Sequence, residues 1–165
     1  MPVDYKRLFE LATPFLEKND LGADHTQRVL DIAKNNFSIP KETEELTVCA
    51  IILHDIGGGS IKDQYEKGPA RAESILRQME ASEDLISQVC SIVGSHHDHP
   101  ETPSISFSIL YDSDKLVMFS PQEFPIYDAS LGFDWNKIID LIYSNKGKQL
   151  AHELLEERKK ELVKK

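Results

Sequence analysis

An apolar segment that ends in an adjacent histidine and aspartate constrains this chain more than any other feature. Residues 46–53 are apolar at all but one position, His54 and Asp55 follow at once, and glycines occupy positions 57–59. A helix that is apolar nearly all round belongs in the interior of a domain, and polar side chains there cost free energy unless something satisfies them. A metal ion would satisfy both side chains. So would a hydrogen bond from His54 to Asp55 or to the backbone, and this stretch alone leaves both interpretations open.

Apolar residues recur at three- and four-residue spacing along most of the chain, a pattern typical of amphipathic helices. No segment shows a convincing strand pattern, and we therefore expect an all-α fold. Residues 60–67 are polar and residues 120–133 contain two prolines and a glycine, so both stretches are expected to be loops, the second a possible lid. The expected helices cover residues 4–18, about 24–37, about 41–56, 69–79, 83–93, 105–119, 134–143 and 148–162.

The ends of these helices carry recognisable signals. Asp24, Ser82 and Asp134 have side chains that are favoured as N-caps. Gly22 suits a C-cap, and Pro14 should weaken or kink the second half of the first helix. Glycines 57–59 follow a helix and lack the strand and Gly-Lys-Ser/Thr of a phosphate loop, so they indicate helix termination and close packing.

Size and charge limit the possible functions. A chain of 165 residues is expected to form one domain. Its formal net charge of −9 disfavours nucleic-acid binding, although a bound divalent cation would still let a small phosphorylated substrate approach.

No apolar run is long enough for a membrane span. The start does not resemble a signal peptide, and Cys49 and Cys90 form no CxxC motif, so we expect reduced thiols in a cytoplasmic protein.

Several histidines and acids stand where helix packing alone does not explain them. They end segments or interrupt apolar helices, and each is costly in place unless they share a partner. Imidazole and carboxylate groups together suit a divalent ion of Mn, Fe, Co, Ni, Zn or Mg. The residues are His25, His54, Asp55, His96, His97, Asp112 and Asp114.

In this order, His25, His54-Asp55 and Asp114 resemble the H…HD…D signature of the HD superfamily of metal-dependent phosphohydrolases. The resemblance covers about residues 20–120, which leaves 134–163 as a C-terminal helical extension of the same domain. Four segments resemble motifs of that family: residues 25–29, 54–57, 68–76 and 112–116.

The resemblance implies that His25, His54, Asp55 and Asp114 are metal ligands. Two imidazoles and two carboxylates leave positions on an octahedral ion for water and a phosphate oxygen. The family pattern places its last ligand before a basic residue and a leucine, which favours Asp114 over Asp112. We expect Asp112 either to orient a ligand or to be an exposed acid.

The family pattern also bears on how many ions are bound. Dinuclear members add one histidine from the start of the small-residue helix and a pair from the next helix. The pair resembles His96-His97, but no histidine lies between positions 54 and 96, and Lys67 stands about where the extra ligand would be. We therefore expect one ion per chain. A second ion would need an acid in place of that histidine: Asp63, Glu66 or Glu73.

The other polar residues near these motifs are candidates for substrate contacts. In a one-metal site, His96 or His97 would bind phosphate or act as general acid, unless it is simply a hydrogen-bonded histidine at a helix end. Arg28 and Lys115 are candidate phosphate contacts or partners of carboxylates, and Lys62 is a weaker one. His99 and His152 are expected at the surface.

The resemblance thus implies a metal-dependent phosphohydrolase that acts on a nucleotide-like or other small phosphate ester through a metal-activated water. One alternative is a phosphodiesterase of cyclic nucleotides or guanosine polyphosphates. Another is a non-catalytic HD domain that senses a nucleotide. A purely structural bundle is disfavoured because Asp112 and Asp114 interrupt an apolar helix.

Overall fold

The computed structural model describes residues 2–164, and all regular structure within that range is helical, as predicted. No helix among these residues is long and apolar enough to cross a membrane. The chain forms two compact units, of which the first ends at Leu110 and the second begins at Tyr111, inside helix α6 (Ile105–Leu116). The expectation of a single domain over 1–165 stays a prediction.

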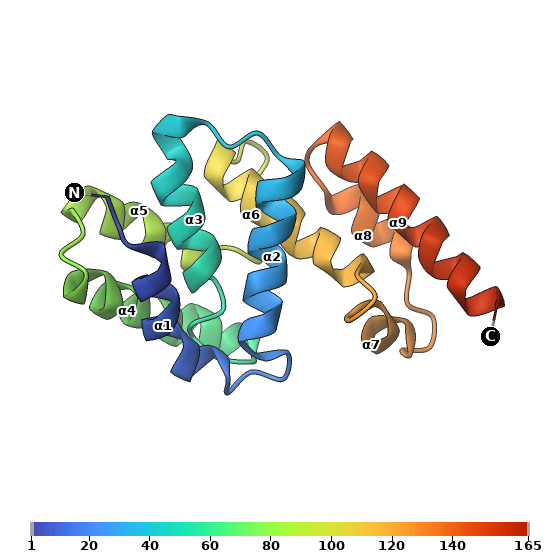
Figure 1. The fold of residues 1–165 in the computed structure, drawn as a ribbon, viewed down its shortest axis with the longest axis horizontal. Coiled ribbons are helices and arrows are strands. Elements are labelled where there is room, and N and C mark those ends of the chain that lie inside the picture. Colours follow the sequence, from blue (N-terminus) through green and yellow to red (C-terminus); the bar gives the residue numbers. More distant parts are fainter. Residues whose placement is uncertain (1, 165) are drawn as a thin grey trace. The chain divides into compact units, whose positions relative to one another are not determined.

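The first unit is built around the apolar segment identified in the sequence (Figure 1). This segment forms helix α3, and its residues 48–53 are each at most 1% exposed. Helices α1, α2 and α5 pack against it, and α4 packs against α5 and α1. The elements are α1 (Tyr5–Leu16), α2 (Gly22–Asn36), η1 (Lys41–Thr43), α3 (Glu44–Leu53), α4 (Ile61–Gln78), α5 (Glu83–Val93) and the beginning of α6.

The prediction of a loop over residues 60–67 is wrong, because this stretch forms the N-cap and the first part of α4. Ser60 is its N-cap and accepts a hydrogen bond from the backbone N–H of Asp63. Most of the polar side chains face solvent, while Gln64 and Gly68 are buried, so the stretch is helical with a narrow inward face. Pro69 accordingly lies inside α4 and not at its first position.

Two helix boundaries also differ from expectation. Gly22 has a φ of +63°, which a side chain would disfavour, and it begins α2, so Asp24 lies in the first turn instead of capping it. Helix α3 ends at Leu53, which makes His54 its C-cap residue. The predicted cap of α5 is confirmed, since Ser82 accepts from the backbone N–H of Leu85 at 3.2 Å.

The second unit has an aromatic core around Trp135. Its indole stacks on Phe124 with ring centroids 4.4 Å apart, and Phe119 and Phe133 lie at 4.8 and 4.7 Å. Phe124 belongs to a short helix within residues 120–133, so the loop expected there is wrong in part. Besides the end of α6, the elements are η2 (Val117–Phe119), α7 (Phe124–Asp128), α8 (Trp135–Leu141), capped by Asp134 as predicted, and α9 (Asn145–Val163), which packs on α8 (Figure 1).

Asp112 ties the end of α6 to the junction between α8 and α9. It is 1% exposed, which rules out the exposed alternative. Its Oδ1 accepts from the backbone N–H of Tyr143 at 2.7 Å, and its Oδ2 from that of Ser144 at 3.0 Å. Burial raises the pKa of this carboxyl, although both hydrogen bonds act in the opposite direction.

Candidate metal centre

The turn after Asp55 lies directly on helix α4 because Gly57 has no side chain. A Cβ placed on Gly57 would come within 2.5 Å of Gln64 Cα and 2.8 Å of the backbone nitrogen of Gly68. Neither backbone atom can move aside cheaply. Close packing, as the sequence indicated for these glycines, is therefore what Gly57 provides.

Two side chains, from α4 and from the segment between α1 and α2, donate hydrogen bonds to the backbone of the turn after His54. The Arg71 guanidinium, from α4, donates to the carbonyl oxygens of Ile56 and Gly57 at 3.1 and 3.0 Å. Asn19, between α1 and α2, donates through Nδ2 to the carbonyl of Asp55 at 3.0 Å. The backbone that carries Asp55 is thus fixed by contacts from both sides.

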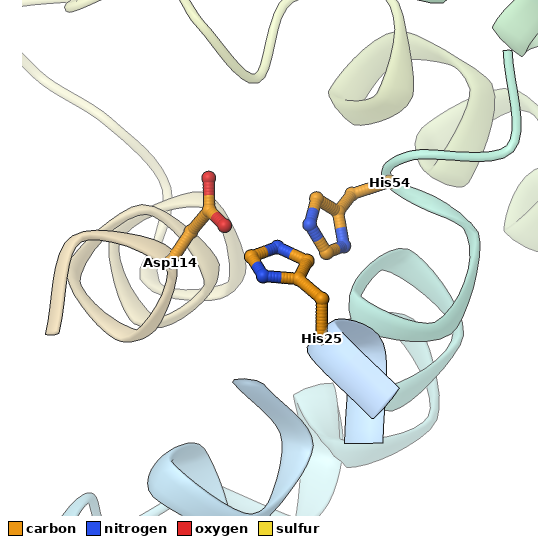
Figure 2. A group of neighbouring side chains, drawn as sticks. All are labelled: His25, His54 and Asp114. Atoms are coloured by element: carbon orange, nitrogen blue, oxygen red, sulfur yellow. The ribbon is translucent and has the colours of Figure 1, made fainter. Parts of the chain in front are cut away.

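Three of the predicted ligands converge within the first unit. His25 comes from the first turn of α2 and His54 from the end of α3, with ring centroids 5.6 Å apart (Figure 2). Their Nε2 atoms lie 3.4 and 3.3 Å from Oδ2 of Asp55. Both rings are buried, at 7% and 0% exposure. Two imidazole nitrogens and one carboxylate oxygen therefore face a common point.

The hydrogen bond of His54 leaves its ring in the form that a metal needs. Nδ1 lies 2.6 Å from the carbonyl oxygen of Ile51. A carbonyl can only accept, so Nδ1 carries the proton, and in the neutral ring the lone pair is on Nε2, on the side of Asp55. The donor set thus fits a divalent cation.

His96 repeats this arrangement on the other side of Asp55. Its Nδ1 lies 2.8 Å from the carbonyl oxygen of Val93, and its Nε2 lies 3.6 Å from Asp55 Oδ1. That Nε2 is buried and has no hydrogen-bond partner among the described residues. Ligand atoms of Asp55, His96 and His97 lie within 4.8 Å of one another, close enough to hold an ion. The two oxygens of Asp55 therefore serve different groups of histidines.

Gln64 is the site residue that the sequence did not reveal. It is 6% exposed, and its Nε2 donates to Asp55 Oδ1 at 2.9 Å and to the carbonyl of Gly58 at 3.0 Å. Its Oε1 accepts from Nε2 of His97. One amide thus bridges the aspartate and the second histidine of the pair.

Lys67 does not occupy the position that the sequence suggested for it. It is exposed and pairs with Asp63 at 3.1 Å, and the pair lowers the pKa of that carboxyl. The inward residue is Gln64, one turn earlier. Its spacing of four from Gly68, which itself precedes Ala72 by four, was a usable signal, since all three lie on one helix face.

The model of the HD domain family matches residues 22–119. The chain belongs to this family. HD domains form a superfamily of metal-dependent phosphohydrolases, and the matched range includes His25, His54, Asp55 and Asp114. Searches of curated proteins and of solved structures returned no match.

The remaining predicted residues of this HD domain lie as follows. Arg28 is half-buried on α2, one turn after His25. Lys62 is exposed at the start of α4, 4.0 Å from Glu66. His99 and His152 are exposed, as predicted. Glu66 and Glu73, two of the acids suggested as substitute ligands for a second ion, are both exposed. Glu73 pairs with Arg77 on its own helix.

Asp114 and Lys115 belong to the last turn of α6, in the second unit. Asp114 is half-buried and its carboxylate is drawn in Figure 2. The Lys115 ammonium lies 5.1 Å from the ring centroid of Tyr111, in cation–π geometry. Their roles as ligand and phosphate contact stay predictions.

Proposed function

We propose that this HD domain is a phosphohydrolase that acts on a nucleotide-like or other small phosphate ester, with one divalent cation held by His25, His54, Asp55 and Asp114. The observation that carries the proposal is the convergence of two histidine Nε2 atoms on Asp55 Oδ2, with the proton of His54 held at Nδ1. A divalent cation bound there supplies an activated water and neutralises phosphate charge.

The choice of Asp114 over Asp112 gains support from the hydrogen bonds of Asp112. Both oxygens of Asp112 accept from backbone N–H groups of the second unit. The Asp112 carboxylate satisfies both of these N–H groups, and its removal would leave two backbone donors without an acceptor. Asp114, two residues later, directly precedes Lys115 and Leu116, and we assign it as the ligand.

The other polar side chains are assigned to the substrate. The net charge of −9 opposes an anionic substrate, so cationic groups must attract it locally. Arg28, Lys115 and Lys62 would contact phosphate oxygens. His96 or His97 would donate a proton to the leaving group, a role that suits imidazole near neutral pH. The substrate is expected to be small, with no nucleic acid and no membrane as partner.

Elemental analysis and a substrate panel test the proposal. Purified protein should carry about one transition-metal ion per chain and should hydrolyse at least one ester among phosphate mono- and diesters after addition of Mn, Co or Ni. Asp55→Ala should lose both metal and activity, because it removes the shared carboxylate. Asp31→Ala, at an exposed aspartate of α2, should keep both.

The outcomes separate the alternatives. Absence of bound metal together with absence of turnover under every metal would contradict the proposal. Turnover of cyclic nucleotides or guanosine polyphosphates alone would assign the phosphodiesterase alternative. Tight nucleotide binding without turnover would assign the sensor. Metal retained by Asp114→Ala would remove Asp114 from the ligand set.

A further inference from the structure

The side of Asp55 that faces away from His25 and His54 has the composition of a second metal site. Asp55 Oδ1, His96 and His97 offer one carboxylate oxygen and two imidazoles within 4.8 Å of one another. His96 presents a buried Nε2 without a hydrogen-bond partner among residues 2–164. What fills the place of a further ligand is the side-chain amide of Gln64.

The orientation of that amide is fixed by its neighbours. Asp55 Oδ1 and the carbonyl oxygen of Gly58 both lie within 3.0 Å of Gln64 Nε2, and both can only accept hydrogen bonds. The NH₂ end must therefore point at Asp55. Oδ1, the carboxylate oxygen that a second cation would need, is already bonded to a donor with a positive partial charge.

The same orientation determines the state of His97. The amide oxygen of Gln64 faces Nε2 of His97 and can only accept, so this nitrogen carries a proton. A protonated ring nitrogen has no lone pair for a metal. Gln64 thus occupies Asp55 Oδ1 and His97 Nε2 at once.

We propose that Gln64 is a positioning residue that restricts this centre to one metal ion by tying Asp55 Oδ1 and His97 Nε2 into a hydrogen-bond network. The inference rests on the proposed metal site of His25, His54, Asp55 and Asp114. It assigns a role to a residue outside that set, and it gives a structural reason for the expectation of one ion per chain.

A histidine at position 64 should reverse the restriction. It removes the NH₂ group from Asp55 Oδ1, releases His97, and offers an imidazole nitrogen from the same buried place on α4. Four ligand atoms would then surround one point, which is a complete set for a divalent transition metal. Gln64→Ala removes the amide but adds no ligand, and should admit a second ion more weakly.

The experiment measures metal stoichiometry and needs no substrate. Full-length protein stripped with a chelator is titrated with Mn²⁺ by calorimetry, and bound metal is measured after desalting. We expect one ion in the wild type and two in Gln64→His, whose paired Mn²⁺ ions should also give an exchange-coupled electron paramagnetic resonance spectrum. Lys67→His is the matched control, since it places a histidine one turn later on the exposed side of α4; it should bind one ion.

Each outcome of this experiment either supports or contradicts the proposed role of Gln64 or the proposed function. Two ions in the wild type, or one ion in a helical and cooperatively folding Gln64→His, overturns the role of Gln64 and leaves the proposed function intact. Two ions in Lys67→His shows that any added histidine suffices, which also overturns it. If Gln64→His fails to fold, a second, weaker site in Gln64→Ala supports the inference and its absence contradicts it. A wild type that binds no ion contradicts the proposed function itself.

Discussion

At Gly57, a single methyl group determines whether the turn after Asp55 can reach helix α4. Gly57→Ala is expected to lower the free energy of unfolding by about 1–3 kcal/mol, because the new Cβ meets backbone atoms that must shift. Urea denaturation followed by circular dichroism measures the loss. Gly59→Ala is the control, since its nearest neighbour is Asn19 Oδ1 at 3.9 Å, and a change within about 0.5 kcal/mol is expected. Equal effects of the two substitutions would refute the packing role.

Burial makes the Cys49 thiol inert. Desolvation in the core raises its pKa to about 12, and the thiolate is the reactive form. In a Cys90→Ser variant at pH 8, Ellman's reagent should label no thiol in the native protein and one after denaturation. Prompt labelling of the native protein would show that the interior around α3 opens readily.

The sequence predicted the residues of the candidate metal site only where a residue type is unusual in its surroundings. A histidine and an aspartate after an apolar run invite an explanation, and three of the four proposed ligands do converge. The residue type of Gln64 is not unusual in its setting, because a glutamine among Lys62, Asp63 and Glu66 looks like ordinary solvated surface, and only its spacing from Gly68 and Ala72 indicated an inward position. Its role depends on burial against the turn at Gly57, which is a tertiary contact.

At the scale of elements, the caps can be tested one by one. Ser82→Ala should cost about 1 kcal/mol in the free energy of unfolding, because the N–H of Leu85 loses its acceptor at the start of α5. Ser87→Ala, at an exposed position inside the same helix, should be neutral or slightly stabilising. Thermal or urea melts of the pair give the comparison; a cost at Ser87 equal to that at Ser82 would argue against capping.

The junction between α8 and α9 depends on one carboxylate of α6. Asp112→Ala should destabilise the protein by roughly 1–3 kcal/mol for each of the two backbone N–H groups left without an acceptor. Asp112→Asn keeps one acceptor oxygen and should lose less. Denaturation curves of both variants check the order, and an alanine variant as stable as the asparagine one would contradict it.

Helix identity was more predictable than helix extent. Apolar periodicity located α1, α2, α3, α5, α6, α8 and α9, because each buries a broad face. The start of α4 was missed because only Gln64 and Gly68 of its first eight residues are buried, so polar composition hid the helix. Short α7 was missed because its buried residue is Phe124 alone, which is too little for a periodic signal.

For the molecule as a whole, metal binding and folding should be linked. An ion that binds only the folded chain stabilises it by about 2.7 kcal/mol at a free concentration 100 times its dissociation constant. Scanning calorimetry should therefore show a higher Tm with added Mn²⁺, reversed by chelator, and no shift in Asp55→Ala. A shift that persists in Asp55→Ala would place the stabilising ion elsewhere.

The all-α class followed from the sequence because a period of three to four residues runs through nearly every apolar segment. The division of the chain between Leu110 and Tyr111 did not, because it falls within one continuous helix. Periodicity reports that a face is buried but not which helices bury it.

The amide of Gln64 has a consequence for how such a centre can change over generations. Every glutamine codon differs from a histidine codon in its third base only, so Gln64→His is a single-nucleotide event. If that variant binds a second ion, a single base change is enough to convert a one-ion centre into a two-ion centre. Descendants of such a gene could then exchange one-ion and two-ion chemistry while keeping the same scaffold of helices.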